Sequence, residues 1–144
     1  MEKSKIKKTN PEKQYRRVLA ASTLEGDKVR NKAWDDLGKV DEIMIDIPSG
    51  RVAYAVVSFG GVLFMGNKLF AVPWDALTID EDKKCFVLDV DKTTLENVPG
   101  FDKNNWPDMA DPTWGKRIFK HYGITPYWDD SEQERVLRGG HGGQ

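Results

Sequence analysis

The sequence predicts a mainly β domain, a small antiparallel barrel or sandwich that carries a helical C-terminal extension. Three observations predict this class. Short apolar segments separated by glycine and proline turns run from residue 17 to residue 90. The one clear signal for an amphipathic helix comes later, after Asp111. At 144 residues the chain is long enough for one domain and short for two.

A hairpin is the clearest local feature of the first half. Residues 38–47 form the longest strand candidate, in which Ile43, Ile45 and Ile47 share one face, and residues 51–59 return as a second strand. Pro48-Ser49-Gly50 between them predicts a tight turn, because proline presets φ and glycine allows a positive φ. Val40 has the opposite parity to Ile43, so we expect a bulge or bend between them.

Shorter segments are expected to complete the sheet. Proline cannot donate to a ladder, so Pro73 should end the strand that precedes it, and residues 80–84 read as a solvated acidic hairpin tip. The remaining predicted strands are residues 18–20, 29–31, 63–65, 69–72, 77–79 and 85–90.

The C-terminal part changes character from Asp91 onward. Residues 93–96 match a capping box, with room for one helical turn. Asp111 and Pro112 then predict a helix start, and Gly123 lies past its end. Trp114, Ile118 and Tyr122 share one face of this helix, which we expect to dock as a lid over an apolar opening of the barrel.

Charge divides the chain into a basic leader and an acidic body. Residues 1–17 hold seven Lys or Arg against two Glu, a net charge of +5, within a total of −1. We expect residues 1–16 to be a flexible leader, 17–92 the barrel, 93–138 an irregular and helical extension packed on it, and 139–144 a flexible tail. No secretory signal and no membrane span is expected, which predicts a cytoplasmic protein.

Residues 18–95 resemble the PRC-barrel domain family. The resemblance rests on Gly38-Lys39-Val40 entering a long strand, on residues 50–57 (GRVAYAVV) and on residues 71–77 (AVPWDAL), which look like the aliphatic-Pro-Trp-x-x-Leu segment of the family. Residues 95–101 and 122–128 look like extensions of stand-alone bacterial members. Related barrels occur in the H subunit of the photosynthetic reaction centre and in the ribosome maturation factor. The resemblance therefore implies a PRC-type barrel that acts as an interaction or assembly module, not an enzyme.

The residues that could carry chemistry give little sign of catalysis. Cys85 is the single cysteine and lies on a predicted strand, which is typical of a small buried side chain. His121 reads as a capping or surface residue near the helix end, and His141 lies among glycines. No nucleophile–base pair, metal-ligand spacing or phosphate-binding glycine loop is evident. We expect no catalytic residue, no metal and no cofactor.

Aromatic side chains and one doubly apolar strand are the best candidates for binding. Residues 52–59 are apolar on both faces, so either residues 93–128 or a second copy must cover one of them. We expect a homodimer, or an unidentified protein partner. The candidate interface and binding residues are Tyr54, Phe59, Phe64, Trp74, Trp106 and Trp114.

Two alternatives remain open from the sequence. One is a ribosome- or RNA-associated factor that binds through the basic leader, although the acidic body argues against a broad nucleic-acid surface. The other is a small-molecule pocket under the C-terminal helix, lined by Trp106 and Trp114. The cations of the first alternative are Lys3, Lys5, Lys7, Lys8, Lys13, Arg16 and Arg17.

Overall fold

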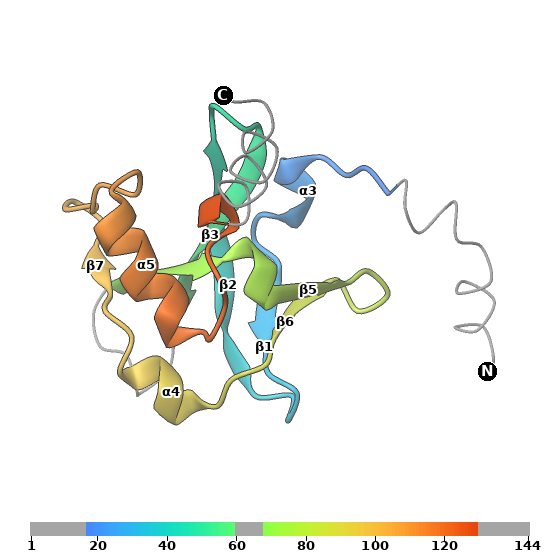
Figure 1. The fold of residues 1–144 in the computed structure, drawn as a ribbon. Helices are drawn as coiled ribbons and strands as arrows, with labels where there is room; N and C mark the ends of the chain where they lie inside the picture. The colour runs from blue at the N-terminus through green and yellow to red at the C-terminus, as the bar shows by residue number, and fades with distance from the viewer. Residues whose placement is uncertain (1–16, 60–67, 130–144) are drawn as a thin grey trace.

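The computed structural model describes residues 17–59 and 68–129, and in this part of the chain the fold is mainly β with a helical C-terminal extension, as predicted (Figure 1). The strands are β1 (Lys28–Arg30), β2 (Asp36–Asp46), β3 (Arg51–Phe59), β4 (Lys68–Pro73), β5 (Leu77–Asp80), β6 (Cys85–Leu88) and β7 (Phe101–Asp102). The helices are α3 (Ala21–Leu24), α4 (Lys92–Glu96) and α5 (Pro112–His121), and a 3-10 turn covers Trp74–Ala76.

The strands form one sheet of seven in the order β5-β6-β1-β2-β3-β4-β7. Its two edges, β5 and β7, do not pair with each other, so the sheet stays open across the described strands. All pairs are antiparallel except β1 with β6, which run parallel. The sheet is therefore the expected antiparallel one with a single parallel pair, introduced where β1 lies between β2 and β6.

The predicted hairpin is confirmed as β2 and β3. Its turn closes with the Gly50 amide donating to the Asp46 carbonyl oxygen at 2.7 Å, and Gly50 has a φ of 77°. The pairing shifts register between Val40 and Glu42, which is the bulge that the parity of the sequence predicts. A second shift lies between Met44 and Ile45, near the hairpin end, where the alternation of apolar residues predicts none.

The entry strand predicted for residues 18–20 is not formed. The chain instead makes the short helix α3, in which the Thr23 amide donates to the Ala20 carbonyl oxygen and the Glu25 amide to Ala21. Leu24 is the buried side chain of this turn and packs into the core of the sheet. A single apolar anchor suits one helical turn better than a strand, whose alternate side chains would all need cover.

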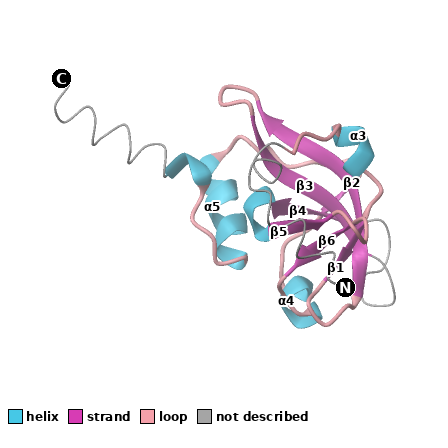
Figure 2. Ribbon diagram, turned by 90° about the vertical axis from the view of Figure 1, so that its right-hand side faces the viewer, coloured by secondary structure: helices cyan, strands magenta, loops and turns pink. Residues whose placement is uncertain are grey.

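Both faces of β3 are covered by the chain itself. One face contributes Ala55, Val57 and Phe59 to a core that also holds residues of α4 and the neighbouring strands. The other face contributes Tyr54 and Val56 to a second core beneath α5. Figure 2 shows α5 beside the strands, on the opposite side from α3. The helix therefore covers the outer face of the sheet, where we had expected a lid over an opening.

The helix ends follow local signals. Asp111 caps α5, its Oδ1 accepting from the Thr113 amide at 3.0 Å, with Pro112 in the first turn as expected. The cap of α4 is Asp91, whose Oδ1 accepts from the Thr94 amide at 2.8 Å. The prediction that Thr93 caps this helix is therefore wrong, because Thr93 lies inside the helix. Among the described helices, none has the length and apolar character to cross a membrane.

Candidate functional site

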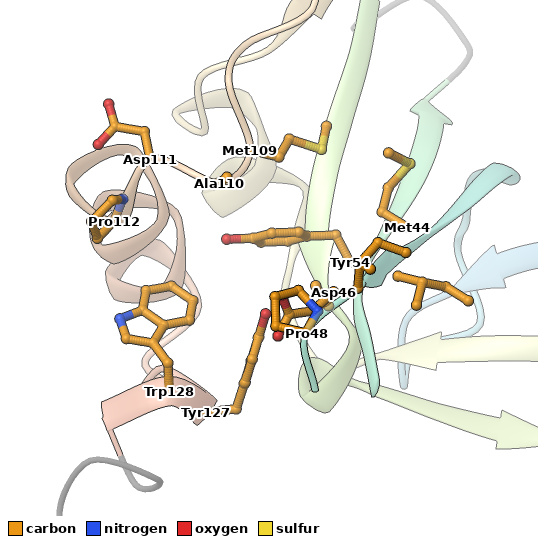
Figure 3. Close-up of a pocket in the computed structure, with 13 residues that line it drawn as sticks. Met44, Asp46, Pro48, Tyr54, Met109, Ala110, Asp111, Pro112, Tyr127 and Trp128 are labelled. Atoms are coloured by element: carbon orange, nitrogen blue, oxygen red, sulfur yellow. The ribbon is translucent and has the colours of Figure 1, made fainter. Parts of the chain in front are cut away.

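A groove opens between the β2–β3 hairpin and the beginning of α5 (Figure 3). Its volume is about 590 Å³, within the usual range for ligand sites. Three segments far apart in sequence build it, namely the hairpin end, the start of α5 and the aromatic pair that follows the helix. The lining residues are Met44, Ile45, Asp46, Ile47, Pro48, Ala53, Tyr54, Met109, Ala110, Asp111, Pro112, Tyr127 and Trp128.

The hairpin side of the groove is apolar and open to solvent. Ile45 is 51% exposed and Ile47 is 81% exposed, and Pro48 beside them is exposed as well. Leaving such side chains in water forgoes roughly 1.5–3 kcal/mol each relative to full burial. Single apolar side chains are common on protein surfaces. A contiguous apolar patch next to a groove is instead typical of an interaction surface.

Tyr54 forms the floor of the groove. Figure 3 shows its ring extending from β3 toward α5, with Met109 on one side and Tyr127 and Trp128 on the other. The ring makes edge contacts with Trp114 and Phe119 of α5, at centroid distances of 5.3 and 5.6 Å. Its hydroxyl is buried and has no hydrogen-bond partner within the described residues. Burial, reinforced by Tyr127, raises the pKa of this hydroxyl, so it stays protonated.

The aromatic pair Tyr127 and Trp128 ties the end of the extension back to the hairpin. The Tyr127 side chain lies beside the Asp46 carboxylate (Figure 3), and partial burial together with this carboxylate raises the pKa of Tyr127. The guanidinium of Arg51 lies 4.8 Å from the centroid of the Tyr127 ring, a cation–π distance. The groove therefore has a wall that is held at the hairpin by polar contacts.

The charged groups among the described residues that line the groove are acidic. Asp46 and Asp111 contribute carboxylates, and no Lys, Arg or His is among the described lining residues. Asp46 Oδ2 accepts from the Ser49 hydroxyl at 2.6 Å. Asp111 Oδ1 accepts from the Thr113 amide at the start of α5. This arrangement can bind an apolar group and favours a cation over an anion beside it.

The model of the PRC-barrel domain family matches residues 16–95, more than half of the chain. The chain belongs to the PRC-barrel domain family. The match contains β1 to β6 and the hairpin side of the groove, and it ends before α5. The other wall of the groove thus comes from the extension that follows the PRC-barrel match.

The PRC-barrel chain is also similar to solved structures, among them a 16S ribosomal RNA processing protein, RimM, from Pseudomonas aeruginosa. The two share 19% identity over 52% of this chain and 45% of that one, with a TM-score of 0.37. This chain therefore spans less than half the length of that protein. The comparison with curated proteins gives no match.

The predicted interface residues that the structure describes do not gather on one surface. Tyr54 and Phe59 are buried at 1% and 4% exposure, so neither can form the rim of an interface. The reason is that α5 covers Tyr54 and the sheet core encloses Phe59. Trp74 is half-buried against Phe86, with ring centroids 5.7 Å apart. Phe64 lies outside the described residues.

The two tryptophans predicted to line a small-molecule pocket do not line the groove. Trp106 is 38% exposed, packs on Phe101 with centroids 5.1 Å apart, and donates from Nε1 to the Lys103 carbonyl oxygen. Trp114 is half-buried against Tyr54. Neither tryptophan lines the groove, because Met109 and the Trp128 ring occupy that side.

The basic leader is outside the described residues except for Arg17. Arg17 forms an ion pair with Glu81 at the β5–β6 turn. The role of Lys3, Lys5, Lys7, Lys8, Lys13 and Arg16 in binding nucleic acid stays a prediction.

The chemically reactive candidates lie apart from the groove. Cys85 is 3% exposed in β6, and burial raises the pKa of its thiol, as expected for a structural cysteine. His121 is exposed at the end of α5 and does not line the groove. Within the described residues, no group of three or more His, Cys, Asp or Glu could hold a metal ion.

Most of the groove was missed at the level of sequence. The apolar period of the sequence places Ile45 and Ile47 on one strand face, and Met109 lies in an irregular segment. One signal was available, because Gly115 lies inside an otherwise good amphipathic helix. A glycine there indicates a close approach of another group.

Proposed function

We propose that this PRC-barrel protein is a non-catalytic interaction module whose binding face is the groove together with its exposed shoulder. We define the shoulder as Ile45, Ile47 and Pro48. The observation that carries the proposal is the 81% exposure of Ile47 beside a largely apolar groove of about 590 Å³. A ligand confined to the groove would leave Ile47 in water, so a protein partner suits this face better than a small molecule.

A non-catalytic role is supported by the chemistry of the groove. Its ionisable groups are two carboxylates and two phenols, and burial holds the Tyr54 phenol in its neutral form. Cys85 and His121, the usual nucleophile and base types, lie elsewhere in the fold. The groove therefore offers contact area and charge, without a nucleophile paired to a base.

A second copy of the chain is the first partner to test, and we propose that the protein self-associates through this face. Light scattering of the full chain across a dilution series measures the mass directly. Ile47→Asp should shift the mass toward the monomer, because it places a charge on the shoulder. Val18→Asp is the matched control, since Val18 is 89% exposed and does not line the groove.

Each result of this series decides something. A dimer that Ile47→Asp dissociates and Val18→Asp does not would support the proposal. A dimer that survives Ile47→Asp would move the interface away from the groove. A chain that is monomeric at every concentration would rule out self-association.

A further inference from the structure

We infer that a second surface, at the opposite end of the β2–β3 ladder from the groove, binds the phosphodiester backbone of a single-stranded nucleic acid through lysine side chains. A hollow of about 570 Å³ opens there, and it shares no described lining residue with the groove. We call it the lysine hollow. Its charged lining residues are Lys28, Lys39, Lys68, Lys103, Asp36 and Asp41. The inference goes beyond the proposed function, because it concerns a different face and a different class of partner.

The net charge of the lysine hollow is opposite to that of the body around it. Its described lining holds four lysines against two aspartates. Residues 18–144 as a whole carry 15 Lys or Arg against 21 Asp or Glu, a net charge of −6. The sequence of residues 60–67, between Phe59 and Lys68, contains no acidic residue that could offset the lysines. An excess of positive charge gathered in a concave surface attracts anions.

Both aspartates of the lysine hollow already have partners. Asp36 Oδ2 accepts from Lys28 Nζ at 3.1 Å. Asp41 Oδ1 accepts from the Ser58 hydroxyl at 3.2 Å. Neither carboxylate is therefore directed to the remaining lysines of the hollow.

Two of the lysines carry the unpaired charge. Lys39 and Lys103 form no ion pair and no hydrogen bond within the described residues, and both are exposed. Lys68 Nζ lies 3.4 Å from Asp102 Oδ1 in an ion pair that is open to solvent on both sides. Exposed ion pairs are weak, so Lys68 can exchange this carboxylate for a phosphate.

The register of the sheet places two of these lysines directly opposite each other. Lys28 of β1 pairs with Lys39 of β2. Like charges at directly opposite positions destabilise a ladder. Asp36 offsets the charge of Lys28 and leaves that of Lys39. An anion bound between the strands would remove this repulsion, which is a second and independent sign of an anion site.

The spread of the lysines favours a chain of phosphates over a single small anion. Lys28, Lys39 and Lys68 belong to β1, β2 and β4, with β3 between the last two. Neighbouring strands lie about 4.8 Å apart, so β1 and β4 are about 14 Å apart along the sheet. One phosphate cannot contact lysines over that width, whereas successive phosphates of a chain can. Lysine binds phosphate as a point charge and reads no base, so we expect little sequence preference.

The test measures binding of a fluorescent oligouridylate to the full chain by fluorescence anisotropy over a series of salt concentrations. Lys39→Gln combined with Lys103→Gln removes the two unpaired charges. It should weaken binding about tenfold at low salt and lower the slope of log affinity against log salt by about 1.4, because each phosphate contact of a single strand contributes about 0.7. Lys103→Gln alone changes no strand residue and should weaken binding about threefold.

The matched control is Lys116→Gln combined with Lys120→Gln. Both lysines are exposed on α5 and do not line the hollow. The two double variants have the same net charge and both keep residues 1–16, so the contribution of the basic leader is the same in each. The control should change the affinity less than twofold. Urea unfolding of the free proteins should show no loss of stability on removing Lys39, because Lys28 lies opposite it.

Three results would overturn the inference. Equal weakening by the two double variants would show that net charge or the leader, and not the lysine hollow, binds the oligonucleotide. Binding of an oligoglutamate of the same charge as tightly as the oligouridylate would identify an acidic polypeptide as the partner. Much weaker binding of oligothymidylate than of oligouridylate would show that the contacts are not to the phosphates alone. The light-scattering result for Ile47→Asp is decided separately, since Ile47 does not line the hollow.

Discussion

A carbon added as a side chain at Gly115 would lie 2.6 Å from Cη2 of Trp128. Real side-chain carbons do not approach so closely, so the absence of a side chain at Gly115 is what lets Trp128 close the groove. The same position would lie 3.0 Å from the Tyr54 hydroxyl. One glycine in α5 thus sets the distance between the helix, the strand and the groove wall.

Gly115→Ala should destabilise the protein even though alanine is the better helix former. Helix propensity alone favours alanine by about 1 kcal/mol. Overpacking against Trp128 and Tyr54 costs about 1–3 kcal/mol, so we expect a net loss or at best no gain. Urea unfolding followed by circular dichroism measures this. Thr113→Ala, at an exposed position of the same helix, controls for propensity. A clear gain in stability at Gly115 would mean that Trp128 moves aside freely.

Tyr54→Phe should raise the free energy of unfolding. The Tyr54 hydroxyl is buried without a partner, and removing such a group recovers about 1 kcal/mol. Tyr127→Phe is the matched comparison, because the Tyr127 hydroxyl is partly exposed beside the Asp46 carboxylate, and its removal should bring no gain and cost up to about 1 kcal/mol. Chemical denaturation of the three proteins gives the two differences. If both variants lost stability, the Tyr54 hydroxyl would have a hydrogen bond in solution.

Alkaline pH should destabilise the fold through Tyr122. Its hydroxyl is buried and unpaired, and burial raises its pKa above the ordinary value of 10.0. Above that value the unfolded chain loses the proton while the folded chain keeps it, so stability falls as pH rises. Thermal unfolding between pH 8 and 11.5 should show the decline, and Tyr122→Phe should make it shallower. An equal slope in both proteins would contradict the burial of this phenol.

The hairpin and the α5 cap could be predicted because their signals are local. The amide of Gly50 bonds to Asp46 within the same turn, and the side chain of Asp111 accepts from the amide two residues later at the start of α5. The groove could not be predicted in this way, since it needs the hairpin near residue 46 to meet Asp111 and Trp128, more than sixty residues further along the chain. The cover of β3 cannot be predicted from the sequence for the same reason. Its two apolar faces show that a cover exists, and only the packed fold identifies α5 as that cover.

The close approach of β2 to β3 at Gly38 yields the last prediction. A side-chain carbon at Gly38 would lie 2.2 Å from the Ser58 carbonyl oxygen, and backbone cannot move aside as a flexible side chain can. Gly26 is the matched control, because its φ is 89° but nothing lies within 4 Å of the added carbon. Gly26→Ala should therefore cost only the left-handed backbone strain, about 1–2 kcal/mol. Gly38→Ala should cost more than Gly26→Ala, because the β2–β3 ladder must separate locally to relieve the clash.

Urea unfolding measures the two costs, and amide hydrogen exchange locates the change. Faster exchange confined to β2 and β3 near Lys39 and Ser58 is expected for Gly38→Ala alone. Equal costs for the two variants would show that backbone conformation, rather than the approach of Ser58, accounts for the glycine at position 38.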